Sequence, residues 1–289
     1  MKDDFKVNPS KTAPEIKVLM YHRVLPEGTK DREYRWSVSQ NELRKHLWLL
    51  EKWGYTFISF QDHFLATTGR LLLPKKPAIL TLDDGYNEIF YHALPILKDF
   101  GVRATVFVLG DRSVKTNRWD VSDGYPEVPL VDDDMLIELH KMGFEIGSHG
   151  MRHVDLTTIG RNDAWEEIAG SKAALEELIH APVTTFAYPY GATNTDLERM
   201  VRTAGYDYGC GSFSGPPKFS TNLFNIRRIQ VTSESNLLGF GIRMLTPYAY
   251  YRWIRWKTIR SSAHKTHTAV PLETKIEESV QSDMEHRRI

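Results

Sequence analysis

The 289-residue chain lacks several features that would define other classes of protein. It has a single cysteine, Cys210, which excludes an intramolecular disulfide framework. Its 37 lysines and arginines equal its 37 aspartates and glutamates, so no excess of positive charge points to nucleic acid. No segment approaches the roughly 20 apolar residues needed to cross a bilayer, and residues 1–14 have no apolar core of signal-peptide length. These absences predict a cytoplasmic protein that binds no nucleic acid.

Glycine-rich phosphate-binding motifs are also missing, which argues against a nucleotide-binding open sheet. Apolar, β-branched runs alternate with helical patterns, and this alternation predicts parallel strands joined by helices. We therefore predict an α/β fold with a closed barrel. The predicted strands are residues 17–22, 56–60, 78–83, 104–109, 145–148, 184–188, 206–210 and 226–231. The predicted helices are residues 40–53, 60–68, 87–100, 133–142, 162–180 and 194–204.

Four of the predicted strands end in ionisable side chains or in a Pro/Gly turn with accessible backbone N–H groups. This is the edge at which α/β barrel enzymes place their catalytic groups, so the pattern predicts an enzyme. Residues 111–130 interrupt the alternation and are expected to form a long loop on the same rim. The four endings are Tyr21-His22, Asp83-Asp84-Gly85, His149 with His153 after it, and Tyr188-Pro189-Tyr190-Gly191.

The adjacent carboxylates Asp83 and Asp84 are the most informative of these endings. Neighbouring side chains of a regular strand point to opposite faces, so Asp83 and Asp84 could not both reach one site from such a strand. A turn at Gly85 relaxes that constraint and can aim both at one site. One carboxylate can then bind a metal while the other accepts a proton. An ordinary Asp-Gly turn is the alternative interpretation.

Asp84, His149 and His153 form a candidate set of three metal ligands. Two imidazoles and one carboxylate leave coordination positions open, as in catalytic zinc sites. Nickel, cobalt and manganese are the other candidate metals. A divalent ion at such a site acidifies water, and Asp83 would take the proton as general base before attack on a carbonyl.

Two further residues complete the predicted catalytic set. The backbone N–H of Tyr190, in a turn stiffened by Pro189, is expected to stabilise the oxyanion. His22 is the candidate acid for the leaving amine, because it too ends a strand. The alternatives are an ordinary Pro-Gly turn for Tyr190 and a structural hydrogen bond for His22.

Three of these segments resemble the motifs of the polysaccharide deacetylases, the NodB-homology group or carbohydrate esterase family 4. Thr81-Leu82-Asp83-Asp84-Gly85 resembles Thr-Phe-Asp-Asp-Gly, residues 148–153 resemble His-Ser/Thr-x-x-His, and Tyr188-Pro189-Tyr190-Gly191 resembles Arg-x-x-x-Pro-Tyr-Gly. The resemblance spans about residues 15–232. It implies a distorted (β/α) barrel, a divalent metal and hydrolysis of N-acetyl groups on amino sugars. By position, it makes Asp83 the base and Asp84, His149 and His153 the metal ligands.

The chain departs from the family pattern at two points. No arginine stands near Thr185 or Phe186, where the third motif has one, so Arg227 or Arg228 is expected to brace Asp83, and we choose Arg228. The late Leu-x-His motif is also missing. The early Tyr-His ending resembles the poly-N-acetylglucosamine deacetylase branch, a rearranged barrel whose acid comes from the N-terminal side, and this favours His22.

The resemblance implies an N-acetylated glycan or a lipid-linked amino sugar as substrate. Two alternatives stay open at this point. The first is a metal-dependent hydrolase of a non-sugar amide or formamide. The second is a catalytically inactive sugar-binding barrel.

The composition changes beyond residue 232. Residues 237–260 contain five lysines or arginines, six aromatic residues and no aspartate or glutamate. Aromatic rings suit the headgroup layer and cations suit anionic lipid, so we expect peripheral contact with the inner face of the membrane. A closing helix packed on the barrel is the alternative. The expected organisation is a flexible N-terminus (1–14), a deacetylase barrel (15–232), a basic aromatic helical extension (233–260) and a disordered tail (261–289).

Overall fold

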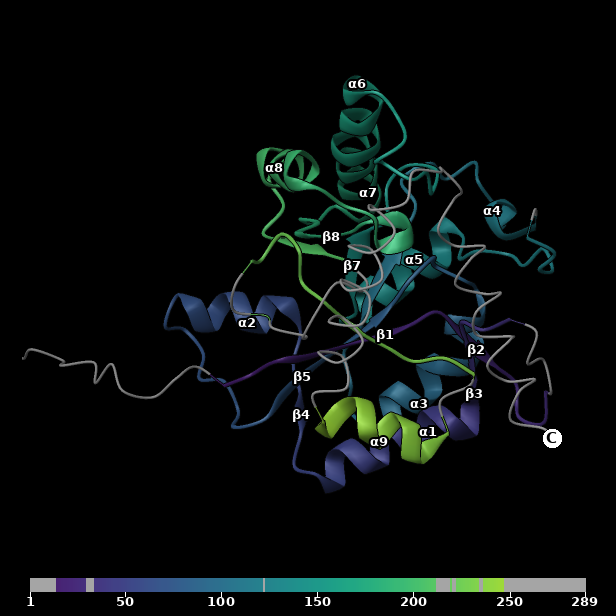
Figure 1. Ribbon diagram of the computed structural model, residues 1–289, viewed down its shortest axis with the longest axis vertical. Coiled ribbons are helices and arrows are strands. Elements are labelled where there is room, and N and C mark those ends of the chain that lie inside the picture. Colours follow the sequence, from purple (N-terminus) through teal and green to yellow (C-terminus); the bar gives the residue numbers. More distant parts are fainter. Residues whose placement is uncertain are drawn as a thin grey trace, which may run out of the picture.

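The strands lie at the centre of the molecule with helices around them (Figure 1). This computed structural model describes residues 14–29, 34–121, 123–211, 219, 222–233 and 236–246. The main sheet is parallel, in the order β10-β1-β5-β6-β7-β8-β9, and β4 pairs with the start of β5. Its strands are β1 (Lys17–Tyr21), β4 (Thr56–Phe57), β5 (Pro77–Leu82), β6 (Thr105–Val108), β7 (Glu145–Ser148), β8 (Thr185–Ala187), β9 (Tyr208–Cys210) and β10 (Ile229–Gln230).

The sheet closes on itself between β9 and β1. Ile226 forms a parallel bridge with Cys210 at the end of β9. Three residues later, Ile229 pairs with Leu19 of β1. One extended segment therefore joins both ends of the sheet, which confirms the predicted distorted (β/α) barrel. Because the strands are parallel, their carboxyl ends meet at one rim.

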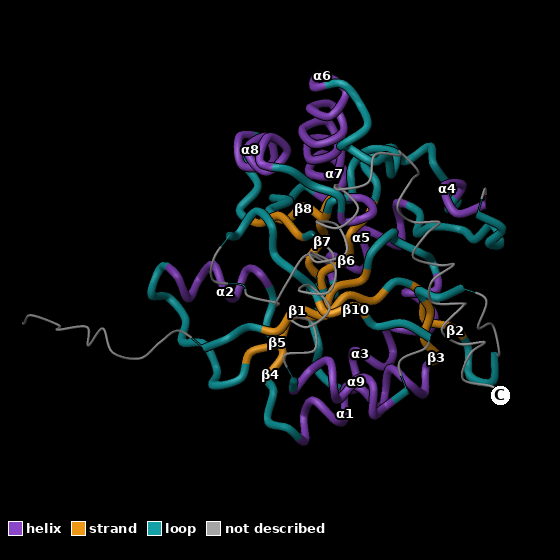
Figure 2. Tube along the Cα trace, viewed as in Figure 1, coloured by secondary structure: helices purple, strands orange, loops and turns teal. Residues whose placement is uncertain are grey.

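Helices cover the outside of the barrel (Figure 2). Several begin at a side-chain cap that the sequence supplies locally: Ser39 and Glu42 form a reciprocal capping box at the start of α1, and Asp132 caps α5. The helices are α1 (Gln40–Lys52), α2 (Phe60–Thr67), α3 (Leu94–Asp99), α4 (Arg118–Val121), α5 (Asp133–Lys141), α6 (Arg161–Trp165), α7 (Ser171–Ile179), α8 (Thr195–Thr203) and α9 (Leu237–Leu245).

Alternate strand residues face two different apolar clusters. Ile79 and Phe107 belong to the cluster inside the barrel, whereas Leu80 and Val106 belong to the larger cluster between the sheet and the helices. Asp83 continues the alternation of Ile79 and Thr81. The strand pattern thus directs this carboxylate toward the barrel interior.

Three features differ from the sequence prediction. The strands β2 (Arg23–Leu25) and β3 (Ser37–Ser39) form a separate parallel pair, which was missed because three residues show no periodicity. The helix α4 lies within the segment predicted as a loop. Two π-helical turns, η1 (Ile89–Ala93) before α3 and η2 (Glu166–Gly170) between α6 and α7, interrupt segments predicted as continuous helices.

Downstream of the barrel, α9 lies alongside α1 (Figure 1). The ring of Phe240 stacks on His46 of α1 with 4.1 Å between centroids. The remainder of the predicted extension, residues 247–260, lies outside the described residues, as do residues 1–13 and the predicted tail 261–289. Within the described ranges, no helix has the length and apolarity needed to span a membrane.

Candidate active site at the barrel rim

Three side chains with metal-ligating atoms meet at the carboxyl ends of β5 and β7. Asp84 Oδ1 lies 3.2 Å from His149 Nε2 and 3.3 Å from His153 Nε2. All three side chains are buried, and the candidate ligand atoms lie within 4.8 Å of one another. The structure therefore brings together the three residues that the sequence predicts as metal ligands.

The hydrogen bonding of His149 indicates that a cation fits between these groups. Its Nδ1 lies 2.8 Å from the carbonyl oxygen of Ala187, which can only accept, so Nδ1 carries a proton. A neutral His149 then turns the lone pair of Nε2 toward the Asp84 carboxylate. Two lone pairs at 3.2 Å repel unless a proton or a metal ion lies between them. A carbonyl acceptor behind a ligating histidine is common at protein metal sites.

Electrostatics favour an ionised Asp84. Burial raises the pKa of its carboxyl group, but hydrogen bonds from His149 and His153 outweigh burial and hold the pKa well below its ordinary value. Burial lowers the pKa of His153, which favours the neutral imidazole that a metal requires. For His149, burial is outweighed by the Asp84 hydrogen bond and the nearby carboxylates, and its pKa is raised.

A left-handed backbone conformation orients the side chains of Asp84 and His153. Asp84 and Gly85 have φ of 70° and 71°, and His153 has φ of 59°. The two successive left-handed residues turn the chain sharply after β5, so Asp83 and Asp84 both reach the rim. A Cβ at position 85 would lie 2.9 Å from Val108 Cγ1, which explains why glycine stands there. Non-glycine residues in this conformation are strained, and such strain concentrates at functional sites.

Glu167 holds the loop between His149 and His153 from behind. Its Oε2 accepts hydrogen bonds from the backbone N–H groups of Met151, at 2.8 Å, and Arg152, at 3.0 Å. The side chain is buried and belongs to the π-helical turn η2. Glu167 was not predicted from the sequence, because a glutamate within a helical pattern is usually exposed. A π-turn is often found at functional sites, but it has no clear signal in the sequence.

Asp83 forms a buried bidentate ion pair with Arg228. Arg228 Nη1 donates to Oδ1 at 2.6 Å and Nη2 donates to Oδ2 at 2.7 Å. The guanidinium also donates to the hydroxyl of Thr81 and to the carbonyl of Gly211, both at 3.1 Å. Of the two arginines considered from the sequence, the structure thus places Arg228 against Asp83. The pairing compensates the buried charge and fixes the orientation of the carboxylate.

His22 and Tyr190 lie at the same rim. His22 lies near enough to Asp84 to contribute electrostatically to the lowered pKa of that carboxyl. The ring of His22 lies 5.0 Å from Trp36, and its buried Nδ1 has no hydrogen-bond partner among the described residues. Tyr190, with φ of 57° in the 3₁₀ turn η3 (Pro189–Gly191), packs edge-on against His153 at 4.7 Å.

Trp119 and Asp120 of α4 complete the site and were not predicted. The indole of Trp119 stacks on the His153 ring with 4.2 Å between centroids. Asp120 Oδ2 accepts hydrogen bonds from the hydroxyls of Tyr34, at 2.9 Å, and Tyr86, at 2.7 Å. These bonds anchor α4 over the rim. The sequence identified the rim segment 111–130, but nothing in its spacing singled out these two residues.

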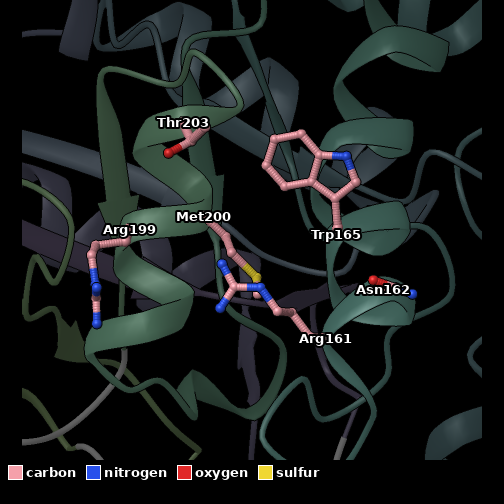
Figure 3. Close-up of a pocket in the computed structure, with 6 residues that line it drawn as sticks. All are labelled: Arg161, Asn162, Trp165, Arg199, Met200 and Thr203. Carbon is pink, nitrogen blue, oxygen red and sulfur yellow. The ribbon is translucent and has the colours of Figure 1, made fainter.

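A surface hollow between α6 and α8 is separate from this site (Figure 3). Both of its walls are helices of the outer layer, and none of its lining residues belongs to the rim set described above. The lining residues are Arg161, Asn162, Trp165, Arg199, Met200 and Thr203.

Sequence comparisons show which proteins this chain resembles. A family model of polysaccharide deacetylase matches residues 72–209. YxkH of Bacillus subtilis, which is named as a polysaccharide deacetylase, is 25% identical over 227 residues, covering 78% of this chain and 75% of YxkH. A poly-beta-1,6-N-acetyl-D-glucosamine N-deacetylase of Staphylococcus aureus is 23% identical over 209 residues, covering 69% of each chain.

Solved structures share the fold. The deacetylase PplD of Streptococcus pyogenes, in complex with acetate, superimposes with a TM-score of 0.67 and 22% identity, over 81% of this chain and 99% of PplD. IcaB from Ammonifex degensii gives a TM-score of 0.63 and 24% identity, over 77% and 94% of the two chains. Residues 72–209 therefore resemble the polysaccharide deacetylases in sequence, and the chain shares the fold of these solved deacetylases.

Proposed function

We propose that this protein is a metal-dependent hydrolase that removes N-acetyl groups from an amino-sugar glycan or a lipid-linked amino sugar. The observation that carries the proposal is the buried set of Asp84, His149 and His153 beside the Asp83–Arg228 pair. The similarity to the S. aureus enzyme, which is named for poly-beta-1,6-N-acetyl-D-glucosamine, supports a sugar amide as substrate.

Asp84, His149 and His153 would hold the divalent ion. Nitrogen and carboxylate ligands with open positions suit zinc best, and also suit nickel, cobalt or manganese. When bound there, the ion supplies Lewis acidity toward the acetyl carbonyl and toward water.

Asp83 accepts the proton of the attacking water in this proposal. Arg228 occupies one lone pair on each carboxylate oxygen, and a second lone pair on each remains to accept a proton. The bidentate contact also prevents rotation of the carboxylate, so the base stays aimed. The backbone N–H of Tyr190 donates to the oxygen that becomes negative as the carbonyl is attacked.

His22 protonates the leaving amine. Its position near Asp84, together with a buried Nδ1 that no described residue bonds, leaves the imidazole available for proton transfer. His22→Ala is therefore expected to lower turnover of sugar amides by ~10²-fold and turnover of activated aryl acetates much less, because a good leaving group needs no proton. An equal loss on both substrates, measured at saturating concentration, would assign His22 a structural role.

Product analysis tests the reaction itself. The protein is loaded in turn with zinc, cobalt, nickel or manganese and incubated with β-1,6- and β-1,4-linked N-acetylglucosamine oligomers, and with N-formylated and non-sugar amides. We expect acetate and free amine in equal amounts from N-acetyl sugars, and a loss of ~10²–10⁴-fold in metal-loaded Asp83→Asn.

Other results point to the alternatives. Release of formate alone, or cleavage of non-sugar amides alone, would indicate a hydrolase of another substrate class. Oligomer binding without any product from metal-loaded protein would indicate a sugar-binding barrel.

A further inference from the structure

The helix α9 has no polar face. Leu238, Ile242 and Leu245 lie four and three residues apart and therefore form one stripe along the helix, the α9 outer face. Their exposed fractions are 73%, 41% and 59%. The opposite side carries Phe240 and Met244, which are buried against the barrel. A surface helix normally turns polar residues outward, whereas a helix that is apolar all round is covered on every side.

No other side chain of α9 supplies the missing polarity. Arg243 is the helix's one charged residue, and its Nη1 donates to the carbonyl of Gln230 at 2.9 Å, on the barrel side. The neighbouring α1 also turns a large ring outward: Trp48 is 49% exposed, with Lys52 Nζ 5.8 Å from its centre. An exposed tryptophan beside a lysine suits the boundary between apolar chains and charged headgroups.

The sequence that follows α9 is rich in aromatic and basic residues. Residues 247–260 contain five aromatic residues, four lysines or arginines and no aspartate or glutamate. In the sequence, α9 is therefore followed by a positively charged, aromatic stretch. We propose that the α9 outer face docks on an anionic lipid surface, with the adjoining basic residues contributing electrostatic attraction.

Two separable forces follow from this arrangement. Burial of the stripe among acyl chains is nearly independent of salt, whereas attraction of the cations to lipid phosphates weakens as salt rises. Both are needed, because a short apolar stripe or a few cations alone gives only weak binding. The inference stands apart from the proposed reaction, since the stripe contains no residue of the rim site.

Vesicle co-sedimentation of the full-length protein tests the proposal. The vesicles are phosphatidylcholine alone, or phosphatidylcholine mixed with phosphatidylglycerol. The test variant is Leu238→Glu with Leu245→Glu. Leu72→Glu is the matched control, because Leu72 is 93% exposed in the segment between α2 and β5.

We expect binding only to the anionic vesicles, with a partition coefficient that falls as NaCl is added. The double variant should lose at least ~tenfold, since two leucines no longer enter the apolar layer, while the Leu72→Glu control should bind as the wild type does. Both variants should keep the wild-type melting temperature and turnover on soluble substrate.

Three results would overturn the proposal. One is equal binding by the double variant and the wild type, and another is no binding to anionic vesicles at all. The third is a concentration-dependent dimer of the wild type that the double variant loses, which would assign the α9 outer face to a second copy of the chain.

Discussion

The barrel rim and the α9 outer face depart in opposite directions from the usual distribution of side chains. At the rim, charged groups are buried: Asp83, Asp84 and Arg228 are each at most 5% exposed. On α9, apolar side chains are exposed. A buried charge and a contiguous exposed apolar stripe are the two departures that carry most information about function.

The two regions differ in what offsets the cost of the buried charges and of the exposed apolar side chains. At the rim, the compensation is internal, because Arg228 matches both oxygens of Asp83 and the histidines face Asp84. On α9, no residue of the described ranges covers the stripe, and we propose that a lipid surface covers it. The comparison supports a role in chemistry for the rim and a role in contact for the α9 outer face.

The largest effect is expected at the proposed metal ligands. His149→Ala or His153→Ala should remove stoichiometric metal and activity together, a loss beyond the ~10²–10⁴-fold expected for a general base. Metal content by mass spectrometry and acetate release measure the two effects. His140→Ala, in the last turn of α5, is the control and should change neither. Full metal occupancy in both ligand variants would contradict the assignment.

The internal compensation at the rim is tested by Arg228→Ala. Removing the partner leaves a buried, unpaired Asp83, so the free energy of unfolding should fall by about 3–5 kcal/mol. The neighbouring, less buried Arg227 makes no bond to Asp83, and Arg227→Ala should change stability by less than about 1 kcal/mol. Urea unfolding measures both variants. Equal losses would show that the ion pair is not the source of the effect.

The two sides of α9 should respond differently to truncation. Phe240→Ala removes a fully buried ring stacked on His46 and should cost about 3 kcal/mol of unfolding free energy. Leu238→Ala, on the α9 outer face, should stay within about 0.5 kcal/mol. A large loss for Leu238→Ala in thermal or urea unfolding would mean that the stripe is covered within the isolated chain.

The smallest effect is a pH dependence at the α1–α9 contact. Burial, together with the nearby charges of Arg243 and Lys45, lowers the pKa of His46 to about 4 from its ordinary value of 6.5. The unfolded chain therefore binds a proton between pH 6.5 and pH 4 that the folded protein does not. Between pH 6.5 and pH 5 this should lower the unfolding free energy by about 2 kcal/mol.

His46→Gln keeps a polar amide that can bond to the hydroxyl of Tyr21 in either direction but does not titrate. Urea unfolding of the variant at several pH values should lack this part of the pH slope. An unchanged slope would show that other groups carry the acid sensitivity.

Local patterns in the sequence predicted much of the fold and part of the site. The alternation of strands and helices indicated the barrel, because periodicity and caps are properties of short segments. Asp84 and His149 were found because they stand at the ends of strands, and His153 because it follows His149 by four residues; parallel strands bring their carboxyl ends to one rim. Gly85 marked the turn that lets Asp83 and Asp84 share that rim.

Only the tertiary structure decided which distant residues meet. Arg228 is 145 residues from Asp83 and reaches it because Ile226 and Ile229 close the barrel between β9 and β1. Glu167, Trp119 and Asp120 reach the site through a π-turn and a short helix, neither of which has a periodic signal. The tertiary structure also decided that the charges of the rim are buried and that the leucines of the α9 outer face are exposed. The surroundings of a side chain depend on how the elements pack and not on its neighbours along the chain.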